Sequence, residues 1–264
     1  MGSLVSFRYR SLAAASLAAA SLAACAPAPA PSQSGGPTNT PSSSSVAPAL
    51  PSASLSMTPS ATPLITAVSA TNARGTARLT ISVLSTVQGF SDEIEGEGLA
   101  ILGSGDADII WSSVVGQTHE IITANELFVQ LEPPSGPWLS IPADEWTPTA
   151  SAGRPLRGIS EITDARLDGD EVLDGVATTR YVGSLDFADH ADGLGLNGQA
   201  LQLAEAAGST RIEVTVWIDE RGLIVQVMRT LIGGGDVSAS TVTRLSEFGI
   251  SAIVTPPTAQ TPIA

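Results

Sequence analysis

The chain contains a single cysteine and no lysine. One cysteine excludes an internal disulfide, so any folded part must be held together by packed side chains. The basic residues are 12 arginines against 26 acidic residues, and the formal net charge is −14. Like charges repel, so this balance argues against binding to nucleic acid or to anionic lipid headgroups. Any contact with lipid is therefore expected to be apolar.

Other common features are scarce or missing. Aromatic residues make up only 4% of the chain, which fits either an internal cavity or packing by Ala and Val. No run is long and apolar enough for a transmembrane helix. We find no Gly-x-Ser-x-Gly elbow, no phosphate-binding glycine loop and no His-Glu-x-x-His. The sequence predicts no enzyme and no cofactor, and a hydrolase would need a nucleophile and base that we do not see.

The one cysteine, Cys25, closes the string Leu-Ala-Ala-Cys. Arg8 and Arg10 precede an uncharged run over 11–24, a combination typical of a secretory signal. A cysteine after two small residues is the bacterial lipobox, so we expect 1–24 to be a lipoprotein signal peptide. Cys25 would then be acylated, with palmitate as an expected chain, and would anchor the protein to the extracytoplasmic face of the cell membrane. The alternative is an ordinary signal with an incidental cysteine.

The composition divides the rest of the chain into three parts. Residues 26–60 are rich in Pro, Ser, Thr and Ala and carry no charge, so 25–62 is predicted to be an acylated cysteine and a disordered tether. Residues 63–255 have the length of one domain. The prolines of 256–264 predict a disordered tail.

Within 63–255, apolar and polar residues alternate as in β-strands. Leu79, Ile81 and Val83 share one strand face, while Thr80 and Ser82 share the other. Strands are predicted near 78–83, 94–102, 107–115, 120–123, 127–131, 138–141, 211–219, 223–231 and 237–248, with a hairpin pairing 162–167 with 178–187. Helices are predicted at 197–207, and from Thr62 with Leu64, Ile65 and Val68 inward. The pattern predicts an α+β fold: a highly curved antiparallel sheet, or half-open β-barrel, with a few helices packed on its concave face.

Several short segments carry a resemblance to a known family when taken in order. After the lipobox and tether come Gly75–Leu79, Gly136–Ile141, Asp174–Tyr181 with Asp186, Val216–Asp219 with Gly222-Leu223, and Glu247–Gly249 followed by Thr255–Pro257. In this order and spacing they resemble the LppX/LprG (LppX_LprAFG) family of actinobacterial lipoproteins, relatives of the LolA/LolB carriers. The resemblance covers most of 63–257.

The resemblance implies a LolA-like lipid-binding domain whose half-open barrel encloses an apolar cavity. In that family the cavity holds lipid or acylated glycolipid for transfer across the cell envelope. The side chains expected to line it here are Leu79, Ile81, Val83, Leu99, Ile101, Ile109, Trp111, Leu127, Val129, Val214, Val216, Val225 and Val227. The alternative is that the same side chains fill a packed core, and pattern alone does not separate the two. The headgroup is expected near 144–157 and 186–197.

The histidines offer little chemistry. His119 is expected at an exposed strand position beside Glu120. His190 stands with Asp186, Asp189 and Asp192, which would suit a metal, although a charged helix entry explains them as well. We therefore predict no metal site. The aspartates at 164, 168, 170 and 174 lack the spacing of a calcium loop.

These features together predict a lipid-anchored, non-enzymatic envelope protein, expected to be monomeric. It would bind lipid or acylated glycolipid in an apolar cavity, for transport or transfer across the envelope, and would have no nucleic-acid partner. The alternative is an extracytoplasmic sensor or scaffold whose sheet is solidly packed and binds a protein partner in the envelope.

Overall fold

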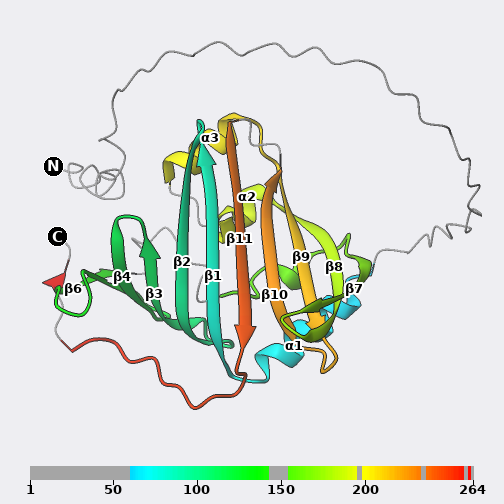
Figure 1. Ribbon diagram of the computed structural model, residues 1–264, viewed down its shortest axis with the longest axis horizontal. Helices are drawn as coiled ribbons and strands as arrows, with labels where there is room; N and C mark the ends of the chain where they lie inside the picture. Colours follow the sequence, from blue (N-terminus) through cyan, green and yellow to red (C-terminus); the bar gives the residue numbers. More distant parts are fainter. Residues whose placement is uncertain (1–59, 143–153, 195–197, 233–235, 259–260, 263–264) are drawn as a thin grey trace, which may run out of the picture. The chain divides into compact units, whose positions relative to one another are not determined.

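The computed structural model describes residues 60–142, 154–194, 198–232, 236–258 and 261–262 (Figure 1). The predicted signal peptide, Cys25 and nearly all of the predicted tether lie outside these residues. Most of the 144–157 segment, where a headgroup is expected, lies outside them too.

One sheet of twelve strands organises the described part of the chain (Figure 1). The strands are β1 (Thr76–Val87), β2 (Phe90–Ile101), β3 (Asp106–Ser113), β4 (Gly116–Ile122), β5 (Glu126–Leu131), β6 (Trp138–Pro142), β7 (Arg166–Leu173), β8 (Val176–Asp186), β9 (Arg211–Asp219), β10 (Ile224–Ile232), β11 (Val237–Ser246) and β12 (Thr261–Pro262). Their spatial order is β12-β6-β5-β4-β3-β2-β1-β11-β10-β9-β8-β7, so the sheet is open, with β12 and β7 at its edges. Every pairing is antiparallel except the one between β12 and β6. The two residues of β12 fall within the segment for which the sequence predicts disorder.

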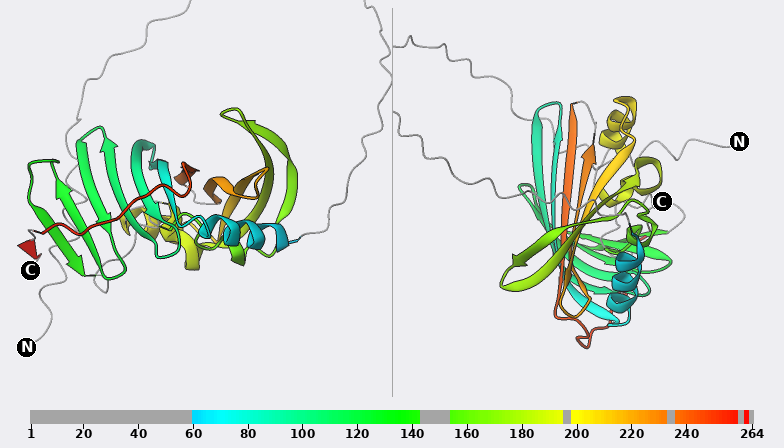
Figure 2. Two further views of the ribbon diagram at one scale, coloured as in Figure 1. Left: turned by 90° about the horizontal axis from the view of Figure 1, so that it is seen from below. Right: turned by 90° about the vertical axis from the view of Figure 1, so that its right-hand side faces the viewer.

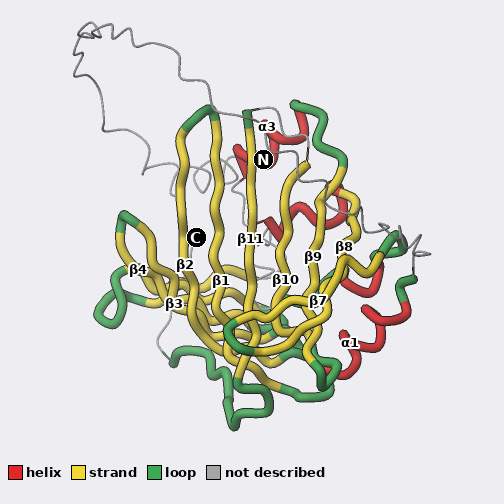
Figure 3. Tube along the Cα trace, turned by 45° about the vertical axis from the view of Figure 1, so that its right-hand side comes forward, coloured by secondary structure: helices red, strands yellow, loops and turns green. Residues whose placement is uncertain are grey.

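The helices lie on one side of this sheet (Figures 2 and 3). They are α1 (Thr62–Asn72), α2 (Phe187–His190) and α3 (Gly198–Ala206), with 3-10 turns η3 (Ile159–Glu161) and η4 (Ala191–Leu194). Their main contacts with the sheet are to strands β8 to β11. We call the helix-bearing side the inner face. The predicted fold class, a curved antiparallel sheet with a few helices against it, is confirmed.

Helix α1 differs from the prediction in the residues that it buries. Leu64 is buried as expected, but Ile65 is 49% exposed. The inward positions three and seven residues after Leu64 are taken by Ala67 and Thr71. They follow the helical repeat of three to four residues, whereas Ile65 stands one residue round the helix, about 100° away.

The short helix α2 was missed, because the extended pattern of 178–187 was continued through Phe187. Asp186 ends β8 and caps α2, accepting a hydrogen bond from the backbone N–H of Ala188.

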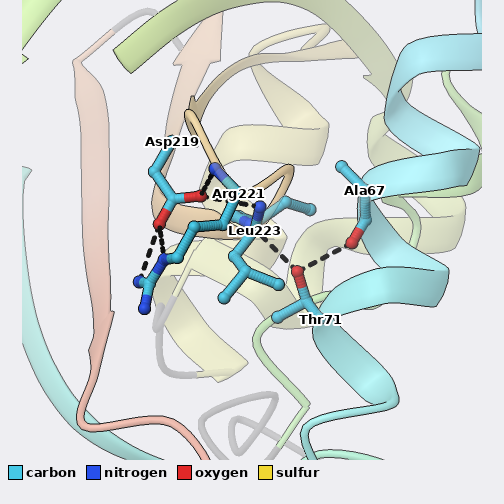
Figure 4. Close-up of polar contacts among 6 residues, drawn as sticks. Ala67, Thr71, Asp219, Arg221 and Leu223 are labelled. Atoms are coloured by element: carbon cyan, nitrogen blue, oxygen red, sulfur yellow. Dashed lines mark hydrogen bonds and ion pairs between the residues drawn. The ribbon is translucent and has the colours of Figure 1, made fainter. Parts of the chain in front are cut away.

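Helix α1 is fixed to the sheet by the side chain of Thr71, which bonds to the backbone at the start of β10 (Figure 4). The Thr71 hydroxyl donates to the carbonyl of Ala67 and accepts from the backbone N–H of Ile224. In the β9–β10 turn, buried Asp219 accepts hydrogen bonds from the backbone N–H groups of Arg221 and Leu223. The turn and the helix end therefore hold each other in place.

The predicted hairpin 162–167/178–187 is present, but its first strand is shifted along the chain: β7 covers Arg166–Leu173, so Asp168-Gly169 lies within the strand and not in the connection. Strand β7 runs straight through Asp168-Gly169, where the register shifts between Leu167 and Gly169 in a β-bulge. The chain turns at Asp174-Gly175, where both residues have positive φ. Asp-Gly is a turn signal, but a glycine also relieves a bulge, and this sequence contains the dipeptide in both roles.

Two glycines let the sheet fold sharply between β2 and β3. Gly96 and Gly98 occupy inner-face positions of β2. A Cβ atom at Gly98 would lie 2.0 Å from the carbonyl oxygen of Asp108, and one at Gly96 would lie 2.7 Å from the Trp111 ring. Only residues without a side chain allow β3 and the Trp111 ring to approach β2 this closely.

Candidate ligand-binding surface

Most of the predicted cavity residues are packed into one core. Eight are buried there together with Leu64, Ala67, Ala200 and Ala204 of the helices. These eight are Leu79, Ile81, Val83, Ile109, Leu127, Val214, Val216 and Val227. Leu79, Ile109, Val214, Val216 and Val227 are 0% exposed, and a side chain beside a water-sized void would keep some accessible area. These five therefore line no such void.

Three of the predicted cavity residues lie elsewhere. Leu99 and Ile101 point to the outer face of β2, because its inner positions are Ile94, Gly96, Gly98 and Ala100. The prediction counted apolar side chains and overlooked that three of these four inner positions are small. Val225 lies at the β-bulge between Ile224 and Gln226 and is only partly buried.

The remaining two, Trp111 and Val129, belong to a surface on β2 to β6. They are partly buried and pack against the core, as do Ile94 and Ile141. All four occupy inner-face positions, and the main helix contacts are with β8 to β11, at the other end of the sheet. We call Ile94, Trp111, Val129 and Ile141 the inner apolar surface. Sequence analysis included two of them and missed the other two.

A carboxyl group stands within the inner apolar surface. Glu120 of β4 lies directly between Ile109 of β3 and Val129 of β5 on the inner face. Its Oε2 atom accepts a hydrogen bond of 2.9 Å from Nε1 of Trp111. Burial raises the pKa of Glu120, and the hydrogen bond from Trp111 opposes that rise without cancelling it.

A hollow among the described residues lies on the opposite, outer face. It is a groove of about 860 Å³ across β11, β1, β2, β3 and β4. Its lining includes Arg78, Glu97, Asp108 and Arg244, and Arg78 forms ion pairs with Glu97 and Glu247. The lining mixes these charged side chains with apolar ones, among them Leu99, one of the predicted cavity residues, but a groove on this face was not predicted. The alternation of Glu95 and Glu97 with Gly96 and Gly98 was its available signal. A second groove of about 490 Å³ lies on β7 to β9.

Both histidines make contacts that the sequence did not indicate. His119 is not a freely exposed strand residue: its Nε2 atom is 2.6 Å from Asp108 Oδ1, and its ring lies 4.9 Å from that of Trp138. His190 is buried, with Nε2 3.4 Å from Glu161 Oε2. Within the described ranges, no group of three or more His, Cys, Asp or Glu residues is arranged to hold a metal ion.

The end of the predicted headgroup segment closes over the inner face. Pro155 and Leu156 are buried. Their segment is held by Arg229, a buried residue of β10 whose Nη2 atom donates to the carbonyls of Pro155 and Arg157.

Of the helices that the structure describes, none has the length and apolar character needed to cross a membrane.

The fold places this chain in the class of open, strongly curved antiparallel sheets with helices against one face. No family model matches the sequence, and no curated protein matches it. Among solved structures, the chain is similar to LprF from Mycobacterium bovis, with 15% identity, 76% of this chain and 99% of that chain covered, and a TM-score of 0.49. It is similar to the lipoprotein LppX from Mycobacterium tuberculosis, with 14% identity, 74% and 97% covered, and a TM-score of 0.48.

A third similar structure is a LolA superfamily protein from Nitrosomonas europaea, with 7% identity, 74% and 95% of the two chains covered, and a TM-score of 0.33. These names are those of the LppX/LprG and LolA-like proteins that the sequence resembles. Likeness at such identities and TM-scores says nothing about a ligand. The function is therefore inferred from this chain's own residues.

Proposed function

We propose that this protein is a lipid-anchored, extracytoplasmic binding protein that holds the acyl part of a lipid or acylated glycolipid and transfers it across the cell envelope. The lipobox at Cys25 supports the anchor. The inner apolar surface supports the binding of an acyl chain. The proposed activity is binding and release, without catalysis.

The observation that carries this proposal is the incomplete burial of the inner apolar surface. Ile94, Trp111, Val129 and Ile141 adjoin a core whose members are almost fully buried, yet they keep accessible area. An acyl chain laid on them would remove that area and its own methylenes from water, at about 0.8 kcal/mol per buried methylene. The closed packing of Leu79, Val214 and Val227 means that a ligand occupies this surface rather than a void between the sheet and the helices.

Native mass spectrometry can test acyl binding with matched substitutions on the two faces of the sheet. The full chain carrying Cys25→Ser, exposed to vesicles of extracted bacterial lipid, is expected to gain the mass of a bound lipid. Val129→Asn, on the inner face, should weaken binding about tenfold by removing apolar contact. Ile110→Asn, on the outer face and 44% exposed, should leave binding unchanged. Thermal unfolding of both variants checks that they fold. No bound lipid, or equal loss in both variants, would overturn the proposal.

The anchor itself needs a separate experiment. The unaltered chain, expressed in a bacterium with a lipoprotein export pathway, should incorporate labelled palmitate and sediment with membranes. Cys25→Ser should lose the label and leave the membrane fraction. Labelling that persists in this variant would refute the anchor without bearing on the lipid-binding domain.

A protein-binding sensor or scaffold is the second candidate, and the packing of the core favours it. Five predicted cavity side chains touch no void, and a groove lined by both charged and apolar side chains lies on the outer face. If the mass spectra show no lipid, and a partner from the envelope is instead bound in a way that an outer-face substitution such as Arg244→Ala abolishes, this second function replaces the first.

A further inference from the structure

Glu120 is an unexpected side chain at its position. It is the one ionisable residue among the inner-face positions of β3, β4, β5 and β6 in the described chain. Its cross-strand neighbours on that face are Ile109 and Val129, both apolar. Packing alone would favour an apolar residue here, because a carboxylate loses hydration when it is taken from water.

The hydrogen bonding of Glu120 is only half completed. Nε1 of Trp111 donates to Oε2, which fixes the orientation of the carboxyl group. No arginine or histidine of the described chain forms an ion pair with it. The other oxygen, Oε1, therefore remains an acceptor within an apolar surface. Trp111, which orients the carboxyl group, is itself part of that surface.

We propose that Glu120 selects the ligand by its polar part: it accepts a hydrogen bond from a hydroxyl group near the start of the acyl chain and repels ligands that carry an anionic group there. This inference rests on the proposed function and specifies its ligand class. The hydroxyl can belong to an acylglycerol or to an acylated sugar. Both are neutral donors, whereas a free fatty acid presents a carboxylate that would face the carboxylate of Glu120.

The experiment compares three probes with the same acyl chain: a monoacylglycerol, a monoacylated glucose and the free fatty acid. Each competes with a fluorescent fatty alcohol for the full chain carrying Cys25→Ser, at neutral and at alkaline pH, so that a carboxyl whose pKa is raised by burial is also measured in its ionised form. The two hydroxyl probes are expected to bind at least about tenfold more tightly than the fatty acid, as fits a hydrogen bond to a charged acceptor. If only one hydroxyl probe shows the preference, it identifies the source.

Glu120→Gln removes the charge and keeps an oxygen that Trp111 can reach. In this variant the fatty acid should bind more tightly and the preference should fall to about twofold or less. Glu95→Gln makes the same change on the outer face and should keep the preference. Thermal unfolding shows whether both variants fold.

The outcomes separate this inference from the proposed function. If none of the acyl probes binds, the proposed function fails. If all three bind and Glu120→Gln leaves their ratio unchanged, the role of Glu120 is refuted while lipid binding stands.

Discussion

The hydroxyl of Thr71 accepts a hydrogen bond of 2.9 Å from the backbone N–H of Ile224, 153 residues further along the chain. This contact joins the last turn of α1 to the first residue of β10. The same hydroxyl donates to the carbonyl of Ala67, so it completes a buried backbone donor of the sheet while remaining bonded within its helix. A helix without charged residues or a side-chain cap at its N-terminus is thereby tied to the sheet.

Replacing Thr71 tests how much this tie stabilises the domain. Thr71→Val keeps the shape of the side chain but leaves the Ile224 N–H buried without an acceptor, so we expect a loss of about 1–3 kcal/mol of unfolding free energy. Thr66→Val is the matched control, since the Thr66 hydroxyl makes an exposed bond within α1 only. Urea unfolding of both variants measures the difference. Equal stabilities of the two variants would mean that the contact adds nothing.

The bend between β2 and β3 depends on a missing side chain. Gly98→Ala would place a Cβ atom 2.0 Å from the Asp108 carbonyl oxygen, a backbone atom that moves only if the strands part. We expect a loss of about 3 kcal/mol or more, in the range of strongly destabilising substitutions. Gly103→Ala, where a Cβ would meet nothing within 4 Å, should change stability little. Calorimetric unfolding of both variants is the measurement, and an unperturbed Gly98→Ala would contradict this account of the bend.

How far the fold could be predicted varied along the chain. The strand β9 was placed residue for residue at 211–219, since its alternation is regular and its neighbours are clear turns. In the hairpin of β7 and β8 the first strand was ended too early, at Leu167, because Asp168-Gly169 and Asp174-Gly175 look alike in sequence, and only strand pairing shows which is a bulge. Alternation predicts that a strand has two faces but does not say which face meets the core.

The candidate site was predictable only in part, for the same reason. Trp111 and Val129 were among the residues expected to contact a ligand, and both lie on the inner apolar surface. Leu99 is apolar too, but the register of β1 and β2 turns it to the outer face. Glu120 was passed over as a polar strand residue. Its significance depends on Ile109, Val129 and Trp111 on neighbouring strands, a relationship that single-strand patterns do not contain.

The charge at Asp164 should stabilise the domain in a pH-dependent way. Partial burial alone would raise the pKa of Asp164, but hydrogen bonds from the backbone N–H and hydroxyl of Ser184, together with the charge of Arg211, outweigh it and lower that pKa. A carboxyl whose pKa is lowered by folding adds stability above its unfolded value, near 3.9, and loses it as the pH falls through the folded value.

Asp164→Asn should therefore reduce stability at neutral pH by at most about 1 kcal/mol, because Asp164 is substantially exposed. The difference from the parent should shrink below pH 4. Thermal unfolding between pH 2.5 and 7 follows it, with Asp92→Asn, on an exposed part of β2, as the control. A difference that stays constant across this range would exclude the ion pair as its source.

Glu120 should show the opposite dependence. Burial holds the pKa of its carboxyl above the ordinary value, so the folded state binds a proton that the unfolded state releases. The associated stability is present below the unfolded pKa, about 4.3, and is lost as the pH rises through the raised folded value. Glu120→Gln cannot ionise, so its stability relative to the parent should rise across that interval and then level off. Glu95→Gln, on the outer face, is the matched control. Chemical unfolding at closely spaced pH values from 3.5 to 8 measures both, and a difference for Glu120→Gln that does not change with pH would show that Glu120 ionises in the folded protein as it does in water.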